Sequence, residues 1–432
     1  KPMITTDEYC ERRARLIKQM PADSMAVVFG AKEVMRNADS HYRFRQNSDF
    51  YYLTGFSEPN AILVLSAKSA ESILFCEPAD AKLEQWTGKR LSPTGALSTL
   101  KVNQAWPITE FSRIFTDICA EHTTVFYPFL SSATAQNTLM LAIDKLKKQR
   151  QAAPIALCDL TPMLSEMRLF KSKAEIAVMR EANHLSIRAH KRAMQACTRL
   201  KYEYELEAEL RFELTRSGGL QMAYEPIVGA GGNACVLHYT QNNQPLCQGA
   251  LVLVDAGGEL DNYAADITRT YPVNGQFSQA QRAIYALVLE AQQQAIKLIK
   301  PGVRWCVLQE TIVNVLTEGL VALNILQGRV DELIAQHAYR PYYMHGSGHW
   351  LGLDVHDSGS YQAEGSSRVL EPGMVLTVEP GLYLPAHLDI AAKWADIGVR
   401  IEDDILVTHD GYENLTQALP VQPQDIEGLI RG

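Results

Sequence analysis

The sequence lacks the features that mark membrane proteins, disulfide-stabilised proteins and nucleic-acid-binding proteins. No stretch offers the roughly 18 uninterrupted apolar residues that a membrane-spanning helix needs. None of the 8 cysteines forms a Cys-x-x-Cys pair, so the thiols are predicted to be reduced rather than part of a zinc cage or a disulfide framework. The net charge of -8 provides no basic stripe for a nucleic-acid duplex. Because the first residues also contain no apolar signal-peptide core, we expect a cytoplasmic location, with no membrane and no nucleic acid as partner.

What is present is the composition of an ordinary globular protein. The chain has 432 residues, of which 47% are hydrophobic and 21% charged, so it is long enough for two domains. In the first part, short apolar runs alternate with helix-like stretches, which predicts an α/β domain with a largely covered sheet. The expected strands are 24–30, 61–65, 72–75 and 155–157, and the expected helices are 6–19 and 133–151.

The pattern changes near residue 170. A long helical stretch is predicted over residues 173–200, and paired strands separated by helices such as 279–300 follow it. Hairpins combined with helices indicate an α+β domain. We therefore predict an N-terminal α/β domain over residues 1–170 and an α+β domain over residues 171–432.

Two aspartates are expected to face each other in a hairpin of the second domain. Residues 251–255 form a predicted strand that ends at Asp255, and residues 263–270 form a second one that contains Asp266. If the turn closes symmetrically in the segment 259–262, the two carboxylates lie directly opposite each other, with Cβ atoms ~5 Å apart. A shared proton or a divalent metal would relieve their repulsion, and two exposed acids without a role remain the alternative.

Histidines and two further acids add to this set. Residues 343–357 contain His345, His349 and His356 among glycines, which disfavours a helical histidine pair of the zincin type. His238 follows another glycine-rich loop. Glu379 ends the predicted strand 374–379, and Arg400 and Glu402 share one face of the predicted strand 399–407.

The charges of one combination balance. The carboxylates of Asp255, Asp266, Glu379 and Glu402 bring four negative charges, two divalent ions bring four positive charges, and a neutral His349 adds none. Ligands dominated by oxygen suit hard or borderline ions such as Mn²⁺.

The order of the motifs resembles that of the pita-bread metallopeptidases, and within them the bacterial aminopeptidase P (Xaa-Pro aminopeptidase) family. The resemblance extends into the first domain through residues 44–56 (FRQNSDFYYLTGF), so it covers essentially the whole chain. In the second domain it is carried by residues 255–257 (DAG), 263–270 (YAADITRT), 345–357 (HGSGHWLGLDVHD), 379–383 (EPGLY) and 400–404 (RIEDD).

The resemblance implies a fold, a cofactor and a set of ligands. The fold would be a creatinase/prolidase-type N-terminal domain followed by a pita-bread catalytic domain. The cofactor would be two divalent metal ions, with Mn²⁺ favoured and Co²⁺ or Zn²⁺ as alternatives. Asp255 would bind one ion, His349 and Glu379 the other, and Asp266 and Glu402 would bridge both.

The resemblance also implies an activity, namely release of the N-terminal residue from peptides with proline in the second position. His238 and His356 would flank the substrate and stabilise the tetrahedral intermediate, and we expect Glu379 to move a proton toward the leaving nitrogen. The substrate-binding group would comprise His345, Tyr383, Arg400 and Trp86. A prolidase acting on Xaa-Pro dipeptides and a non-catalytic peptide-binding protein remain alternatives, and a homo-oligomer, either a tetramer or a dimer, is expected.

Overall fold

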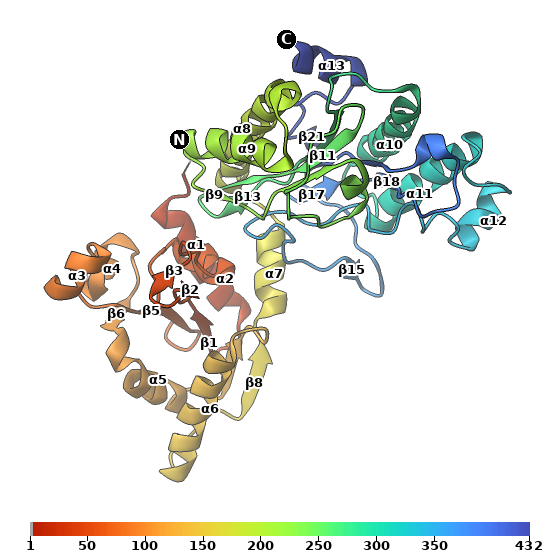
Figure 1. Cartoon of the computed structure of the whole chain (residues 1–432). Coiled ribbons are helices and arrows are strands. Elements are labelled where there is room, and N and C mark those ends of the chain that lie inside the picture. The colour runs from red at the N-terminus through yellow and green to blue at the C-terminus, as the bar shows by residue number, and fades with distance from the viewer. Residues whose placement is uncertain (1–2) are drawn as a thin grey trace. The chain divides into compact units, whose positions relative to one another are not determined.

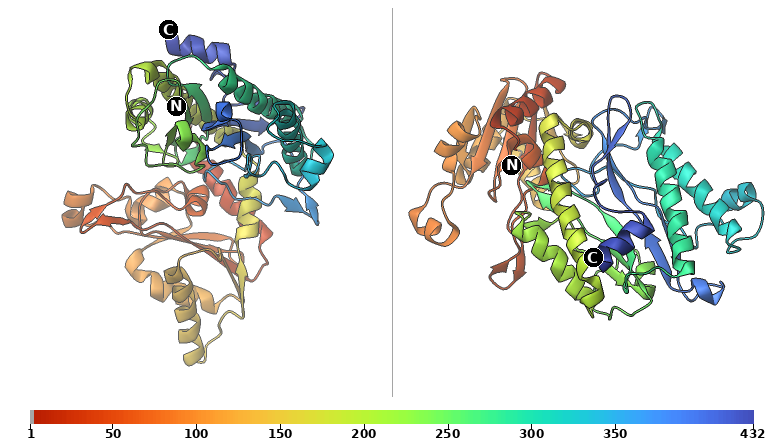
Figure 2. Two further views of the ribbon diagram at one scale, coloured as in Figure 1. Left: turned by 45° about the vertical axis from the view of Figure 1, so that its right-hand side comes forward. Right: turned by 90° about the horizontal axis from the view of Figure 1, so that it is seen from above.

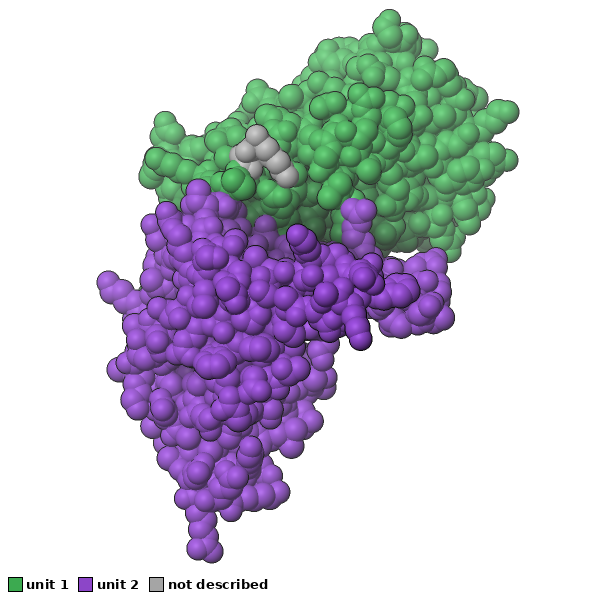
Figure 3. All heavy atoms as spheres, turned by 90° about the vertical axis from the view of Figure 1, so that its left-hand side faces the viewer, with its two compact units in different colours: residues 1–3, 169–432 green, residues 4–168 purple. Residues whose placement is uncertain are grey.

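The computed structural model describes residues 3–432, which fall into two compact units (Figures 1 and 3). One unit comprises residues 4–168, and the other comprises residue 3 together with residues 169–432. Within residues 3–432, no helix has both the length and the apolar character needed to cross a membrane. All 8 cysteines lie in this range and are free thiols, as the sequence predicts.

The unit of residues 4–168 is built on a mixed six-stranded sheet with strand order β6-β5-β4-β1-β7-β8. Strand β4 runs antiparallel to β1 and β5, whereas β6, β7 and β8 each run parallel to their inner neighbour. The strands of the sheet are β1 (Ser24–Phe29), β4 (Ile62–Ser66), β5 (Glu71–Cys76), β6 (Gln104–Pro107), β7 (Thr124–Tyr127) and β8 (Ala156–Asp159). A separate small hairpin joins β2 (Met35–Asn37) and β3 (Ser40–His41).

Helices surround this sheet, and apolar side chains of two of them form its core. Phe111 and Phe115 of α5 and Leu139 of α6 pack with Val27 and Phe75 of the sheet. The helices are α1 (Thr6–Gln19), α2 (Ser48–Thr54), α3 (Ala81–Thr87), α4 (Ser92–Thr99), α5 (Phe111–Ala120), α6 (Ala133–Lys148) and α7 (Thr161–Leu169), and a 3₁₀ turn, η1, spans Ile108–Glu110. The alternation of strands and helices confirms the predicted α/β character.

The unit of residues 169–432 combines antiparallel strands with six α-helices. Helix α8 packs against α9, and α10 packs against α11 (Figure 2). The helices are α8 (Lys173–Ala196), α9 (Glu203–Arg216), α10 (Gln279–Lys297), α11 (Trp305–Ala322), α12 (Val330–Ala335) and α13 (Pro423–Arg431). Three 3₁₀ turns are η2 (Cys197–Arg199), η3 (Gly231–Cys235) and η4 (Ala392–Trp394).

Several small antiparallel sheets form the centre of this unit, and their inner faces share one large apolar core with the helices. Two sheets have the strand orders β10-β11-β14 and β17-β20-β21, and the four candidate acidic ligands lie in their strands or within two residues of them. Their strands are β10 (Ile227–Ala230), β11 (Leu251–Asp255), β14 (Thr268–Pro272), β17 (Val375–Val378), β20 (Asp403–Val407) and β21 (Tyr412–Asn414). The others are β9 (Gln221–Met222), β12 (Gly258–Leu260), β13 (Tyr263–Ala264), β15 (Gln362–Ala363), β16 (Ser366–Ser367), β18 (Gly381–Leu384) and β19 (Ile397–Arg400).

The aspartate hairpin exists, but its register differs from the predicted one. Asp255 pairs with Thr268 rather than with Asp266, because the turn is centred on Asp261 and Asn262, one residue later than expected. Both turn residues have positive φ, of 47° and 68°, as tight hairpin turns require. The shift moves the partner of each residue by two positions along the opposite strand. Because side chains alternate between the two faces with period two, Asp255 and Asp266 still share one face.

The predicted strand 399–407 is in fact two strands in different sheets. Strand β19 ends at Arg400 and pairs with β18, whereas β20 begins at Asp403 and pairs with β17. Glu402 lies in the break, where its backbone exchanges hydrogen bonds with that of Thr268. The break therefore brings Glu402 to the aspartate hairpin.

Candidate metal centre

A cavity of about 530 Å³ in the unit of residues 169–432 collects most of the predicted site residues. All five predicted ligands line it, and so do the other three predicted histidines and Arg400. Tyr383 is fully buried and reaches this group through a hydrogen bond to Arg400. Trp86 belongs to α3 in the other unit and is 88% exposed. The lining residues predicted from the sequence are Asp255, Asp266, His349, Glu379, Glu402, His238, His345, His356 and Arg400.

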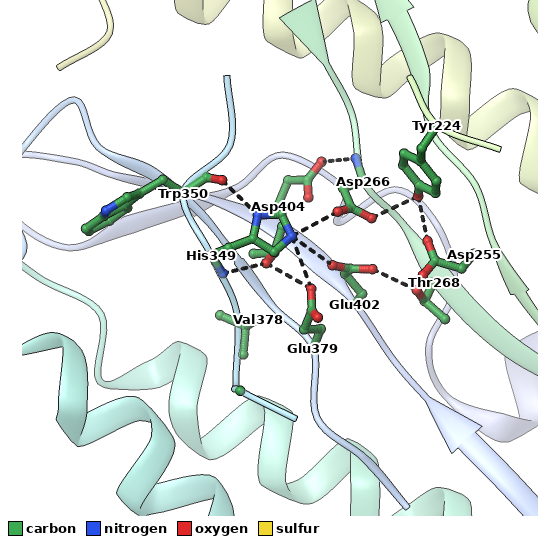
Figure 4. Close-up of polar contacts among 12 residues, drawn as sticks. Tyr224, Asp255, Asp266, Thr268, His349, Trp350, Val378, Glu379, Glu402 and Asp404 are labelled. Atoms are coloured by element: carbon green, nitrogen blue, oxygen red, sulfur yellow. Dashed lines mark hydrogen bonds and ion pairs between the residues drawn. The ribbon is translucent and has the colours of Figure 1, made fainter. Parts of the chain in front are cut away.

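Four side chains meet at one point of this cavity. Ligand atoms of Asp266, His349, Glu379 and Glu402 all lie within 4.8 Å of one another. His349 Nε2 is 3.1 Å from Asp266 Oδ2, 3.4 Å from Glu379 Oε2 and 4.0 Å from Glu402 Oε2 (Figure 4). Such a cluster of carboxylates around one imidazole has the donor atoms that divalent cations bind.

His349 is held in one orientation by the backbone of the next residue and by β17. Its Nδ1 donates to the carbonyl of Trp350 at 2.7 Å, which leaves Nε2 facing the carboxylates. The surrounding segment lies along β17, with the Thr377 amide donating to the His349 carbonyl. A Cβ at Gly348 would lie 1.9 Å from the Thr377 carbonyl oxygen, so only glycine permits this approach. This contact explains why the residue directly before His349 is glycine.

Asp255 joins the cluster through Tyr224, a residue that the sequence analysis missed. The Tyr224 hydroxyl lies 2.5 Å from Asp255 Oδ1 and 2.8 Å from Asp266 Oδ1, so it connects the two carboxylates (Figure 4). Arg400 donates to the other oxygen of Asp255 at 2.9 Å and to the Tyr383 hydroxyl at 3.1 Å. Tyr224 stands alone before β10, in no charged or glycine-rich motif, and no sequence pattern singles it out.

Buried partners fix the remaining acids. The Thr268 hydroxyl donates to Glu402 at 2.7 Å, and the Thr377 hydroxyl donates to Glu379 at 3.1 Å. The backbone amide of Asp266 donates to Asp404 Oδ2 at 3.0 Å. Hydroxyl groups that orient carboxylates in this way are typical of the outer shell of a metal site.

The side chains of the cluster by themselves carry more negative charge than a buried site favours. Burial and the charge of Asp266 raise the pKa of Asp255 to about 7, although Arg400 acts in the opposite direction. Burial also raises the pKa of Glu402 well above its ordinary value. Burial acts to lower the pKa of His349, but contacts with Asp266 and other acids outweigh it and raise that pKa to about 11. The pKa values of Asp255, Glu402 and His349 are thus all raised when the side chains have no metal ion beside them, and a bound cation would displace their protons.

One buried oxygen indicates that a cation belongs here. Glu402 Oε2 is buried and accepts no hydrogen bond from any of residues 3–432, although it points into the cluster. A buried carboxylate oxygen that accepts no hydrogen bond is unfavourable even with an imidazole nitrogen 4.0 Å away, and a metal ion would satisfy it. The donor set therefore fits divalent metal.

The three predicted histidines outside the cluster occupy different positions. The ring centroid of His356 lies 4.4 Å from that of His349. His345 Nε2 is 2.7 Å from the Tyr383 hydroxyl, and His238 lines the cavity from the loop after η3. All three histidines are thus placed where a molecule in the cavity would meet them.

The Tyr224 hydroxyl is expected to strengthen metal binding. Tyr224→Phe removes the hydroxyl but keeps the ring, so Asp255 and Asp266 lose the group that connects them. We expect metal affinity to fall ~10–100-fold, the usual result of losing a partner that orients ligands. Calorimetric titration of the metal-stripped protein with Mn²⁺ measures this, with the exposed Tyr412→Phe as the control. Equal affinities for both variants would contradict the assigned role.

Glu203 holds the loops that carry His238. It is completely buried at the start of α9, and each of its carboxylate oxygens accepts two hydrogen bonds. The donors are the amide of Ala230 at 2.9 Å, the side chain of Asn233 at 3.0 Å, the hydroxyl of Tyr239 at 2.6 Å and the amide of Gln244 at 2.9 Å.

Removing this carboxylate should destabilise the fold. Glu203→Ala leaves buried donors unsatisfied, each costing ~1–3 kcal/mol, so we expect the free energy of unfolding to fall by at least ~3 kcal/mol. Urea unfolding followed by circular dichroism measures the change. The same experiment on Glu209→Ala, at a partly exposed position of the same helix, serves as control, and equal stabilities of the two variants would refute the prediction.

Comparisons with known proteins agree with this geometry. Residues 177–409 match the model of metallopeptidase family M24, and residues 9–127 match that of the aminopeptidase P N-terminal domain. The chain is 46% identical to the Xaa-Pro aminopeptidase of Escherichia coli (strain K12), over 99% of this chain and 98% of that protein. It is 34% identical to Xaa-Pro aminopeptidase 3 of Homo sapiens, over 99% of this chain and 86% of that protein.

Solved structures give the same result. Aminopeptidase P from E. coli with the inhibitor Pro-Leu superposes with a TM-score of 0.95 at 45% identity, covering 99% of this chain and 98% of the other. Proline aminopeptidase P II from Yersinia pestis superposes with a TM-score of 0.96 at 45% identity, covering 99% and 100%. The predicted fold class is confirmed. The chain therefore belongs to metallopeptidase family M24, with an N-terminal unit of the aminopeptidase P type and a C-terminal unit of the pita-bread fold.

Proposed function

We propose that the protein is a metal-dependent aminopeptidase that releases the N-terminal residue from peptides with proline in the second position. The observation that carries the proposal is the cluster of Asp266, His349, Glu379 and Glu402 in a cavity that three further histidines line. Two relatives that match over 99% of this chain, both Xaa-Pro aminopeptidases, support the substrate class.

We assign Asp255, Asp266, His349, Glu379 and Glu402 as the ligands of two divalent ions, with Mn²⁺ as the favoured metal. Four carboxylates balance two dications, and oxygen-rich ligation suits Mn²⁺. Two bound ions supply Lewis-acid polarisation of a carbonyl group and lower the pKa of water. The position of Asp266 between Tyr224 and His349 supports a bridging role for its carboxylate.

The protein's own side chains then supply orientation and proton transfer. His356 and His238 donate hydrogen bonds to the oxygen that gains negative charge when the scissile carbonyl is attacked. Glu379 accepts the proton of the attacking water and delivers it to the leaving nitrogen. That delivery is required because the nitrogen of an Xaa-Pro bond carries no hydrogen and leaves as an amine only when it is protonated. His345 contacts the peptide beyond the scissile bond, and Arg400 and Tyr383 keep Asp255 in place.

The remaining parts of the proposal concern organisation. The two compact units support a division into domains 1–170 and 171–432. A homo-oligomer, a tetramer or a dimer, would use the exposed Trp86 to contribute to substrate binding in a neighbouring subunit. We place the protein in the cytoplasm.

Hydrolysis of matched peptides tests the proposed function. An Xaa-Pro-Xaa tripeptide, an Xaa-Ala-Xaa tripeptide and an Xaa-Pro dipeptide are offered to protein that has been stripped of metal and then reloaded with Mn²⁺. We expect turnover of the proline tripeptide only, and only after metal is restored. Preference for the dipeptide would indicate a prolidase, and turnover without metal would overturn the proposal.

The pKa shifts predict how metal binding depends on pH. Asp255 must lose its proton to bind metal, and its pKa is raised to about 7, so the apo-protein releases protons on binding. We therefore expect Mn²⁺ binding to weaken as the pH falls below 7. The Kd should rise about tenfold per pH unit for each displaced proton. Titrations between pH 6 and pH 8 measure this, and a constant Kd would contradict it.

A further inference from the structure

A buried ion pair lies beside the loop that carries His356. Lys171 Nζ is 3.0 Å from Asp357 Oδ2, and both side chains are only 1% exposed. Lys171 precedes α8, and Asp357 directly follows His356 in the chain. Removing two charges from water is so unfavourable that a buried pair is weak evidence for a stabilising role. Its position next to a candidate catalytic histidine therefore calls for another explanation.

The carboxylate of Asp357 closes the loop of residues 350–357 on itself. Its Oδ1 accepts a hydrogen bond from the Asp354 amide at 3.2 Å, and its own amide donates to the Trp350 carbonyl at 3.0 Å. That carbonyl also accepts from Nδ1 of His349 at 2.7 Å. One backbone oxygen thus connects the orientation of the His349 ring with the end of the loop that presents His356.

The ion pair is also enclosed by backbone. A Cβ at Gly352 would lie 2.4 Å from Asp357 Oδ2 and 3.0 Å from Lys171 Cε, so the pair occupies the space of a side chain. The Gly352 carbonyl accepts from the amide of Ala264, two residues before Asp266. The loop is therefore fixed both to the aspartate hairpin and, through Lys171, to the segment that leads into α8.

We infer that Lys171 and Asp357 are positioning residues, whose ion pair fixes His356 relative to His349. The inference rests on the proposed function, because it takes the role of His356 from there. Neither residue lines the cavity or belongs to the four-residue cluster, so the pair would act on the site through the loop of residues 350–357. Its loss should therefore lower turnover while metal binding and substrate affinity stay nearly constant.

A double-variant experiment separates positioning from general stability. We expect Asp357→Asn to lower kcat about tenfold or more, since a small displacement of a reacting group has effects of this size, while KM and Mn²⁺ content change less than about twofold. In a His356→Ala background the same substitution should cause no further loss of kcat, because its effect passes through His356. Glu413→Gln, which breaks the exposed Arg180–Glu413 pair in the same unit, should leave kcat unchanged.

Two results would overturn the inference, and they differ. If the losses of Asp357→Asn and His356→Ala multiply, the pair acts by another route, while the proposed function stands. If His356→Ala keeps the wild-type kcat, the role of His356 in the proposed function fails, and the inference fails with it. If Asp357→Asn does not fold, the double variant Lys171→Met with Asp357→Asn replaces it, because that variant buries no unpaired charge. The same changes in kcat, KM and Mn²⁺ content are expected for it.

Discussion

Replacing Asp266 by alanine is expected to abolish metal-dependent peptide hydrolysis while leaving the fold intact. The side chain lies within the four-residue cluster and also contacts Tyr224, so its loss removes a ligand that we assign to both ions. We expect kcat/KM to fall by about 10³-fold or more, because an interaction used throughout catalysis is lost. Steady-state kinetics at saturating Mn²⁺ measures the effect.

The fold should survive because the local backbone contact does not need the side chain. The Asp266 amide, which alanine retains, donates to Asp404. Removing one of several crowded carboxylates also relieves repulsion, so the Tm of the metal-stripped variant should not fall below that of the metal-stripped parent. Asp410→Ala, in an exposed loop, is the control. Wild-type turnover by Asp266→Ala with metal saturating would refute the assignment.

His356→Ala, unlike Asp266→Ala, should retain the bound metal and lose only turnover. The ring lines the cavity beside His349 but is not one of the four clustered ligands. Losing a hydrogen-bond donor to a developing oxyanion costs ~10²–10³-fold in kcat, and we expect a loss in this range. Metal analysis of the purified variant together with single-turnover kinetics measures both properties.

The control for this variant is His184→Ala. His184 is exposed on α8 in the same unit and does not line the cavity. It should keep both metal and turnover. A loss of metal from His356→Ala would show that His356 acts as a ligand, and the division of roles among the histidines would then be wrong.

The parts of the fold that local sequence determines were predictable. Helix α1 spans the predicted residues 6–19, since Thr5 caps its start and the chain turns extended at Met20. Strand β11 spans the predicted residues 251–255, four apolar residues followed by Asp255, and it is buried throughout. In both cases the signal lies within the element itself.

Register and strand breaks were not predictable, because they depend on contacts distant in sequence. The hairpin turn at Asp261 and Asn262 shifts the partner of Asp255 from Asp266 to Thr268. The break at Glu402 follows from its backbone pairing with Thr268, more than a hundred residues earlier. Neither contact leaves a periodic signal.

The same limit applies to the site. The clustered acids and His349 were predictable because several motifs occur in a defined order and their charges balance two dications. Tyr224 was missed because its importance comes only from where its hydroxyl lies, between Asp255 and Asp266. Asp404 and Thr268 lie inside motifs that carry the family resemblance, yet only the structure reveals their hydrogen bonds to the ligands.

We propose that two divalent cations hold the buried acids of the cavity together. An anomalous difference map, recorded at the manganese absorption edge from a crystal grown with Mn²⁺, tests it most directly. We expect two peaks bounded by Asp255, Asp266, His349, Glu379 and Glu402. A map without peaks there, with the carboxylates turned away from one another, would contradict it.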